Sequence, residues 1–309
     1  MATERGVEEE DPTNFFVKVP GEPRRKCIDG QMWPSLVRAE HVRSAKRYQP
    51  DDDDLFVVTF PKCGTTWTQN ICTQLMHNGY APEHGKELYL VSPMIEAKGA
   101  QGVKDLPRPR VIKTHFNYPD IPKGPGVRYV FVARNPKDVC VSFFFHHIAI
   151  KGLYDWTDGK FDDFFELFFA GKLEYGDYFE YMRGWMPHYE DPNVLVLKYE
   201  DMLTDLPSAV KRIAAFLGGP AEQAVATPGQ LQKIVANCSF DEMSKEQKRF
   251  FALDNENHSF IRKGQKKDWL NHFSKEQSER VDQMWKEHMT GTPMEHWWSE
   301  EMKYEERHE

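Results

Sequence analysis

The stretch VVTFPKCGTTWTQNI, residues 57–71, joins an apolar run, a short turn and an apolar pattern at helical spacing. The apolar run predicts a buried strand, and the pattern after the turn predicts a helix. A strand that turns directly into a helix presents backbone N–H groups at the helix start, where they can bind a phosphate. The stretch therefore predicts a P-loop-like phosphate-binding turn at the end of a strand.

Further apolar runs alternate with helical patterns along the rest of the chain. The runs that predict buried strands are Leu55–Phe60, Arg110–Thr114, Arg128–Ala133 and Val194–Lys198. The helical patterns cover Thr66–Asn78, Pro136–Ile150, Phe161–Ala170, Tyr178–Tyr189 and Ser208–Leu217. Such alternation is typical of the α/β class. We expect a central, mostly parallel sheet with helices on both faces.

Composition indicates one large domain. The chain has 309 residues, 40% of them hydrophobic, and no Gly/Ser-rich linker divides it. We interpret residues 1–50 as a partly mobile N-terminal segment and residues 51–309 as the main domain. The acidic runs Glu8–Asp11 and Asp51–Asp54 are expected to be solvated. The net charge of −8 argues against a nucleic-acid partner.

Cysteine usage and hydropathy favour a reducing, aqueous compartment. Five cysteines lie without metal-ligand spacing, at positions 27, 63, 72, 140 and 238. The first residues lack the apolar core of a signal peptide, and no apolar run approaches 18 residues. We therefore expect a cytoplasmic protein that does not enter a membrane. The pair His146 and His147 lacks carboxylate or cysteine partners nearby, so no metal site is predicted.

Polar side chains follow each predicted strand. Lys62 follows the first strand, Lys113 and His115 stand at the end of the second, Arg134 follows the third, and Tyr199 follows the fourth. Ligands of open parallel sheets bind at the carboxyl ends of the strands. These side chains should therefore converge on one rim.

The loop differs from the ATPase pattern G-x-x-x-x-G-K-[ST]. With Gly64 on the second glycine, Thr59 occupies the position of the first, and Thr65 replaces the lysine. An NTPase also has an aspartate near its metal at a strand end, whereas Arg128–Ala133 is followed by Arg134. An arginine repels a metal ion and attracts a phosphate. The rim is therefore predicted to bind phosphate without a metal.

Lys113 and His115 are two residues apart, so their side chains share one face of the predicted strand. A nearby ammonium group lowers the pKa of a histidine and keeps its imidazole able to accept a proton. This arrangement suits deprotonation of an acceptor hydroxyl or amine. A structural histidine and a surface arginine are the alternative interpretations of His115 and Arg134.

The blocks TFPKCGTTW, KTH, VFVARNPKDVCVSFF, LKYEDM, CSFDEM and FIRKGQKKDW follow one another from Thr59 to Trp269. Their content and order resemble the signature blocks of the cytosolic sulfotransferases. Those enzymes transfer a sulfuryl group from 3′-phosphoadenosine 5′-phosphosulfate (PAPS) to small acceptors and release the bisphosphate PAP. The resemblance implies a sulfotransferase that uses PAPS.

The resemblance also implies a donor site. Lys62 would neutralise the leaving phosphate, the loop backbone would bind the 5′-phosphate, and aromatic side chains would contact the adenine. Arg134, Ser142 and the loop Arg262–Gly264 would bind the 3′-phosphate. The implied donor-binding residues are Lys62, Cys63, Gly64, Thr65, Thr66, Trp67, Arg134, Ser142, Tyr199, Cys238, Ser239, Phe240, Arg262, Lys263 and Gly264.

By the same resemblance, the catalytic residues would be Lys62, Lys113, Ser142 and His115, with His115 as general base. No metal is needed, because the lysines would compensate the charge of a transferring sulfuryl group. The acceptor would contact Lys113, His115, Met94, Phe145 and His146. We expect a phenol, a catecholamine or a similar small molecule.

The chain departs from the family pattern at several positions. Cys63 replaces a serine, Cys238 replaces a threonine and is expected to expose its thiol to oxidation, and Lys267 replaces a glycine. Lys267 could alter the loop or add charge for the 3′-phosphate. The family's dimer motif K-x-x-x-T-V-x-x-x-E corresponds to Leu270–Glu279, where only Glu279 matches. A monomer is therefore predicted.

Two functions of other classes remain open. One is a nucleoside or nucleotide kinase, which the replaced loop lysine disfavours. The other is a non-catalytic PAPS-binding protein of the same fold. Retention of Lys62, Lys113, His115 and Ser142 together argues against it.

Overall fold

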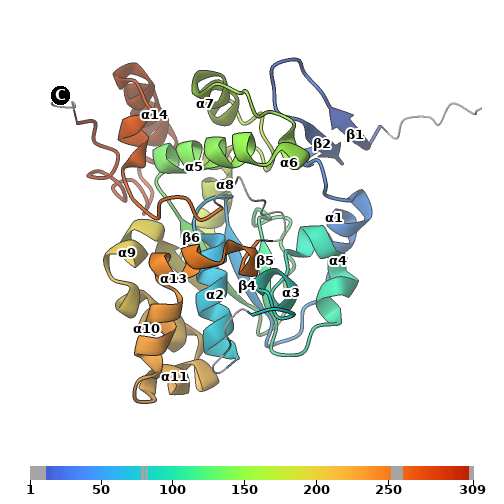
Figure 1. Ribbon diagram of the computed structural model, residues 1–309, viewed down its shortest axis with the longest axis vertical. Helices are drawn as coiled ribbons and strands as arrows, with labels where there is room; N and C mark the ends of the chain where they lie inside the picture. Colours follow the sequence, from blue (N-terminus) through green and yellow to red (C-terminus); the bar gives the residue numbers. More distant parts are fainter. Residues whose placement is uncertain (1–11, 78–79, 81–82, 252–259, 306–309) are drawn as a thin grey trace, which may run out of the picture.

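The computed structural model describes residues 12–77, 80, 83–251 and 260–305. At its centre lies a parallel four-stranded sheet in the order β5-β4-β6-β7. Figure 1 labels β5, β4 and β6 of this sheet. Its strands are β4 (Leu55–Thr59), β5 (Val111–Thr114), β6 (Arg128–Ala133) and β7 (Val194–Lys198). The predicted strands are confirmed, with ends that shift by no more than one residue.

Side chains on the two faces of this sheet pack into two separate cores. Leu55 and Val57 of β4 lie in one core with apolar residues of α2 (Thr65–Met76) and α10 (Leu206–Leu217). Phe56 and Val58 lie in the other core, which includes α8 (Tyr178–Trp185). Successive side chains of a strand point to opposite faces. The predicted α/β architecture, with helices on both faces, is confirmed.

The remaining helices surround this centre. They are α1 (Ala39–Lys46), α3 (Leu88–Val91), α4 (Ile95–Lys104), α5 (Pro136–Ala149), α6 (Lys151–Tyr154), α7 (Phe161–Phe169), α9 (Tyr199–Thr204), α11 (Gly219–Ala226), α12 (Gln230–Asn237), α13 (Phe240–Lys245) and α14 (Lys275–Met289). Short 3₁₀ turns are η1 (Met186–His188), η2 (Gln247–Arg249) and η3 (Asp268–Asn271).

The predicted helices are present, but several of their ends shift, and the predicted end at Asn78 lies outside the described residues. Two of the shifted boundaries have clear local reasons. The predicted helix Tyr178–Tyr189 ends at Trp185 and continues as η1, because Pro187 lacks the N–H that an α-helix needs. The predicted helix at Ser208 begins at Leu206 instead. The side chain of Asp205 accepts a hydrogen bond from the Ser208 N–H at 2.9 Å and caps that end.

The described part of the N-terminal segment forms structure that the sequence patterns did not predict. Strands β1 (Asn14–Val17), β2 (Arg25–Ile28) and β3 (Gln31–Pro34) make an antiparallel sheet. Trp33 is buried and packs edge-on against Phe116, with ring centroids 5.8 Å apart. A domain division at residue 50 remains a prediction. The acidic run Glu8–Asp11 lies outside the described residues.

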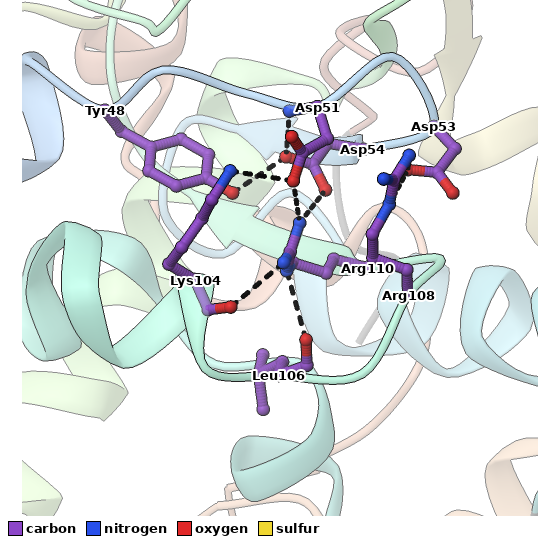
Figure 2. Close-up of polar contacts among 8 residues, drawn as sticks. All are labelled: Tyr48, Asp51, Asp53, Asp54, Lys104, Leu106, Arg108 and Arg110. Atoms are coloured by element: carbon purple, nitrogen blue, oxygen red, sulfur yellow. Dashed lines mark hydrogen bonds and ion pairs between the residues drawn. The ribbon is translucent and has the colours of Figure 1, made fainter.

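The second acidic run is solvated only in part: Asp52 is exposed as predicted, but Asp54 is buried, contrary to the prediction. Asp54 is fully buried, and both its oxygens accept hydrogen bonds (Figure 2), one from Tyr48 at 2.8 Å and one from Arg110 at 3.2 Å. Arg110 also donates to Asp51 at 2.6 Å, and Lys104 donates to the same carboxylate at 2.8 Å. The run neutralises basic residues that the linear sequence keeps far away.

Candidate active site

A cavity of about 500 Å³ opens at the carboxyl ends of the sheet strands, and it is lined by Lys113 of β5 and by residues that follow each of the four strands. The predicted site residues that line it are Lys62, Gly64, Thr65, Thr66, Trp67, Met94, Lys113, His115, Arg134, Ser142, His146, Tyr199, Cys238, Ser239, Phe240, Arg262, Lys263 and Gly264. The parallel strands therefore bring together side chains that are up to about two hundred positions apart in sequence.

The turn between β4 and α2 has the shape of a phosphate-binding loop. Gly64 has φ +94°, and a Cβ there would lie 2.7 Å from the Tyr199 ring, so only glycine fits. Lys62 also has a left-handed backbone, with φ 69°. Such strained residues concentrate at functional sites. The hydroxyls of Thr59 and Thr65 are 2.6 Å apart, so Thr59 supports the loop from the position of the missing glycine.

His115 is held from two sides at the end of β5. Its ring Nδ1 lies 2.8 Å from the Thr59 carbonyl oxygen. Its backbone N–H donates to the buried carboxylate of Glu96 at 2.6 Å. Because a carbonyl only accepts, Nδ1 carries the proton and Nε2 keeps its lone pair. Burial and then the Lys113 charge lower the pKa of His115 to about 3, so the ring is neutral at pH 7.

Lys62 and Lys113, at the carboxyl end of the sheet, both have pKa values below the usual range for lysine. Burial, followed by the charges of Lys113, Arg134 and Arg262, lowers the pKa of Lys62 to about 7. Burial lowers the pKa of Lys113 to about 8, although the Glu96 charge opposes this. An anionic ligand in the cavity would offset these effects and restore both charges.

Arg134 lies between the loop and the basic segment near residue 264. Its guanidinium donates to the Lys62 carbonyl at 3.0 Å and to the Gln265 carbonyl at 3.2 Å. It also lies 4.3 Å from the centre of the Tyr199 ring. Arg134 is thus a buried cation that joins the loop after β4 to the basic segment and lines the cavity, and it is not an isolated surface ion pair.

The basic segment is organised by one buried carboxylate. Asp268 accepts hydrogen bonds from Arg262 at 2.5 Å and from Lys263 at 2.6 Å. Gly264 has φ +60°, and a Cβ there would clash with the Phe240 ring at 2.3 Å. That close approach explains the glycine and places Phe240 over the segment.

Lys267, which replaces a family glycine, adopts a left-handed backbone with φ 62°. Its N–H donates to Asp138 at 2.8 Å, so the loop keeps this conformation despite the Cβ. Its ammonium group pairs with Glu305 at 2.7 Å and is not among the cavity-lining groups. The charge of Lys267 is therefore directed to Glu305.

The structure places two predicted site residues outside the cavity lining. Cys63 is fully buried behind the loop. The ring of Phe145 lies 4.4 Å from the Arg262 guanidinium and supports that side chain. The expected exposure of the Cys238 thiol is wrong. Its side chain is buried, and its sulfur accepts hydrogen bonds from Gln74 at 3.1 Å and Asn70 at 3.4 Å.

Several cavity residues were not predicted. From the N-terminal segment and from the chain after residue 150 they include Pro34, Leu36, Val37, Leu153, Tyr154, Tyr175, Phe251 and Phe260. Tyr175 packs against the His115 ring, with centroids 5.1 Å apart. These contacts are made across the fold, and no local sequence pattern indicates them.

Within the described residues, no group of three His, Cys, Asp or Glu side chains is arranged to hold a metal ion. In the same part of the chain, no helix has the length and apolar character needed to cross a membrane.

A loop at a helix start, a cluster of cations and a neutral histidine at the carboxyl end of the sheet are the groups expected in an enzyme that transfers a group from a phosphate-bearing donor. Residues 52–293 match the sulfotransferase domain family. The chain therefore belongs to the sulfotransferases, which confirms the family resemblance.

Characterised relatives agree with this assignment. Human sulfotransferase 1C2 is 31% identical over 261 residues, covering 79% of this chain and 86% of the relative. Rabbit amine sulfotransferase is 31% identical over 283 residues, covering 85% and 90%. The crystal structure of mouse sulfotransferase SULT7A1 complexed with PAP superposes with a TM-score of 0.74 and 26% identity, covering 88% of this chain and 96% of the other.

Proposed function

We propose that this sulfotransferase transfers a sulfuryl group from PAPS to a hydroxyl or amine of a small acceptor, with His115 as general base. The PAP complex of the mouse relative supports the choice of donor. The family assignment and the cations that line the cavity support the reaction class.

The tautomer of the His115 ring is the main support for its proposed role as general base. The 2.8 Å contact with the Thr59 carbonyl puts the proton on Nδ1 and leaves Nε2 able to accept one. An anionic donor beside the ring would raise the pKa of His115 from its low value in the free protein. The imidazole would thus become a stronger base when the donor is bound.

The neighbouring residues would compensate charge and bind the phosphates of the donor. Lys62 and Lys113 would compensate charge on the leaving phosphate and on the sulfuryl group, respectively. Backbone N–H groups at the start of α2 would bind the 5′-phosphate. Arg134, Ser142 and the segment Arg262–Gly264 would bind the 3′-phosphate. No metal takes part in this scheme.

The acceptor would lie among the apolar residues of the cavity. Met94, Leu153, Phe251 and Phe260 supply that surface, and His115 lines the same cavity. We propose a phenol, a catecholamine or a similar small molecule. The rabbit relative is named for amines, which supports testing amines beside hydroxyl compounds.

Incubation with ³⁵S-labelled PAPS and a panel of phenols, amines, steroids and alcohols tests the proposal. The His115→Ala variant should lose about 10²–10⁴-fold in transfer rate, as expected for removal of a general base. It should bind PAP with near-normal affinity. The exposed His296→Ala variant serves as the matched control.

Full transfer activity in His115→Ala would exclude the general-base role. Binding of PAP by the wild-type protein without transfer to any acceptor would indicate a non-catalytic binding protein. Phosphoryl transfer from ATP with Mg²⁺ would indicate a kinase.

We also propose a mainly monomeric, cytoplasmic protein. Lys275 and Glu279 are exposed on α14, where the family's dimer motif would lie. In a two-fold contact Lys275 would stand opposite its own copy or a close neighbour, and like charges there cost several kcal/mol. Sedimentation at micromolar concentration should show a monomer. A dimer that mutation of Lys275 or Glu279 dissociates would contradict this.

A further inference from the structure

His146 and His147 are neighbours on α5, but the structure gives them different surroundings. His147 is fully buried. Its Nδ1 lies 2.8 Å from the Phe143 carbonyl oxygen, and its Nε2 lies 2.9 Å from the Glu174 carboxylate. His146 is half-buried and lines the cavity. His147 is therefore a packing residue, whereas His146 borders the cavity.

His146 contacts the lysine of the phosphate-binding loop. Its Nδ1 lies 3.5 Å from the Lys62 ammonium nitrogen. A charged ammonium group only donates hydrogen bonds, so Nδ1 must act as the acceptor. On another side, the same ammonium nitrogen lies 4.4 Å from the centre of the Phe260 ring. Lys62 is thus held by an imidazole nitrogen and an aromatic face.

The His146 ring is itself fixed by aromatic neighbours. Its centroid lies 5.6 Å from that of Tyr154 and 5.9 Å from those of Phe251 and Phe260. Tyr154 belongs to α6, whereas Phe251 precedes residues 252–259 and Phe260 follows them. Such packing restricts the imidazole and keeps Nδ1 directed at one position.

In the free protein, where no anion offsets the neighbouring cations, the charged state of Lys62 needs this support. Burial and the facing charges of Lys113, Arg134 and Arg262 bring the pKa of Lys62 down to about 7, so part of the population is neutral at physiological pH. A neutral lysine cannot compensate charge on a leaving phosphate. A hydrogen-bond acceptor beside the ammonium group favours the charged form.

We propose that His146 is a positioning residue for Lys62: it acts on sulfuryl transfer through the orientation and charge of that ammonium group. This role is additional to any contact with the acceptor, and it rests on the proposed function. A phenylalanine at this position would fill the same aromatic surroundings but could not accept the hydrogen bond.

Kinetics of substituted proteins test the role. At pH 7 and saturating PAPS and acceptor, His146→Phe should lower kcat about tenfold, which corresponds to about 1.36 kcal/mol, because the hydrogen bond to the Lys62 ammonium group is lost. His146→Asn, whose side-chain oxygen can stand near the place of Nδ1, should recover most of this loss. His146→Leu provides a second apolar variant if His146→Phe does not fold.

The pattern among these variants decides between roles. Equal losses in the Phe and Asn variants would show that His146 acts through packing and would overturn the proposal. An effect confined to the KM for the acceptor would also overturn the proposal, because it would mean that His146 contacts only the acceptor. An unchanged kcat in both apolar variants would exclude the role altogether. His296→Phe controls for a histidine substitution outside the cavity.

A second readout does not depend on sulfuryl transfer. Lysines carrying ¹³C-methyl groups can be titrated by NMR, with the Lys62 signal assigned by its loss in Lys62→Arg. His146→Phe should lower the pKa of Lys62, and His146→Asn should bring it back toward the wild-type value. An unchanged Lys62 titration would overturn the proposal. A wild-type protein inactive with PAPS would instead disprove the proposed function, while this titration would still test the contact.

Discussion

The two ends of the parallel sheet use charge in opposite ways. At the amino end, Arg110 lies against Asp51 and Asp54, and Tyr48 and Lys104 complete the network (Figure 2). At the carboxyl end, Lys62 and Lys113 face the cavity beside Arg134. Basic side chains are thus neutralised within the protein at one end and directed at a ligand space at the other.

The pKa shifts follow this difference. Although burial opposes it, hydrogen bonds to Asp51 and Asp54 raise the pKa of Arg110. Burial and neighbouring cations lower the pKa of Lys62, and burial lowers that of Lys113. The amino end therefore stabilises the fold, whereas the carboxyl end keeps charges that favour binding of an anion.

Replacement of Arg110 should have the largest effect on folding. Arg110→Met leaves the buried Asp54 carboxylate without its cation, and breaking a buried pair in this way costs about 3–5 kcal/mol. We expect that loss in the free energy of unfolding, measured by urea denaturation. Transfer activity per folded molecule should not change, because this network lies at the end of the sheet opposite the cavity.

Arg108→Met is the matched control. Arg108 pairs with Asp53, but both side chains are largely exposed, and exposed pairs contribute little. Its unfolding free energy should stay close to that of the wild type. If the two substitutions were equally harmful, burial would not be what distinguishes the Arg110 network.

The sequence alone predicted the sheet and most of the rim, because both depend on local patterns. Apolar runs identify buried strands, and parallel strands align their carboxyl ends. The amino-end network was missed for the opposite reason. Asp54 and Arg110 are 56 positions apart, and an acidic run gives no sign of a partner just before β5, the neighbouring strand of the sheet.

Inside the site, too, the sequence did not show which distant residues contact one another. The motif block FIRKGQKKDW contains Arg262, Lys263 and Asp268, but it does not indicate that Asp268 is the carboxylate that both basic side chains share. The direction of the Lys267 side chain depends on Glu305, 38 positions later. Phe145 belongs to the helix that bears Ser142, yet its helical position directs it under Arg262. Such details require the packed structure.

Replacement of Arg134 tests whether the cations at the carboxyl end of the sheet bind a ligand. Arg134→Ala should weaken PAP far more than adenosine 5′-phosphate, since only PAP has the 3′-phosphate. The loss of one charge-assisted contact costs roughly 1.5–3 kcal/mol. Calorimetric titration with both nucleotides measures the difference. Equal losses would mean that Arg134 acts through its bonds to the Lys62 and Gln265 carbonyls and not through the 3′-phosphate.

The smallest expected effect is the pH dependence of PAP binding. It directly measures how far Lys62 and Lys113 are protonated in the free protein. In the free protein Lys62 and Lys113 have pKa values of about 7 and 8. Bound phosphates would raise both, so binding takes up protons above pH 7. Affinity should be highest below the free-state values and fall as pH rises toward the bound-state values. Between pH 7 and 9 we expect about a tenfold loss, equal to one pKa unit of linkage.

Calorimetry in two buffers of different ionisation enthalpy measures this proton uptake directly at pH 8. Lys62→Arg, which stays charged throughout, should reduce both the uptake and the slope of affinity against pH. Arg134 keeps its charge over this range and cannot produce the same dependence. An affinity independent of pH from 7 to 9 would show that the lysines are already fully charged in the free protein. The two ends of the sheet would then differ in geometry alone.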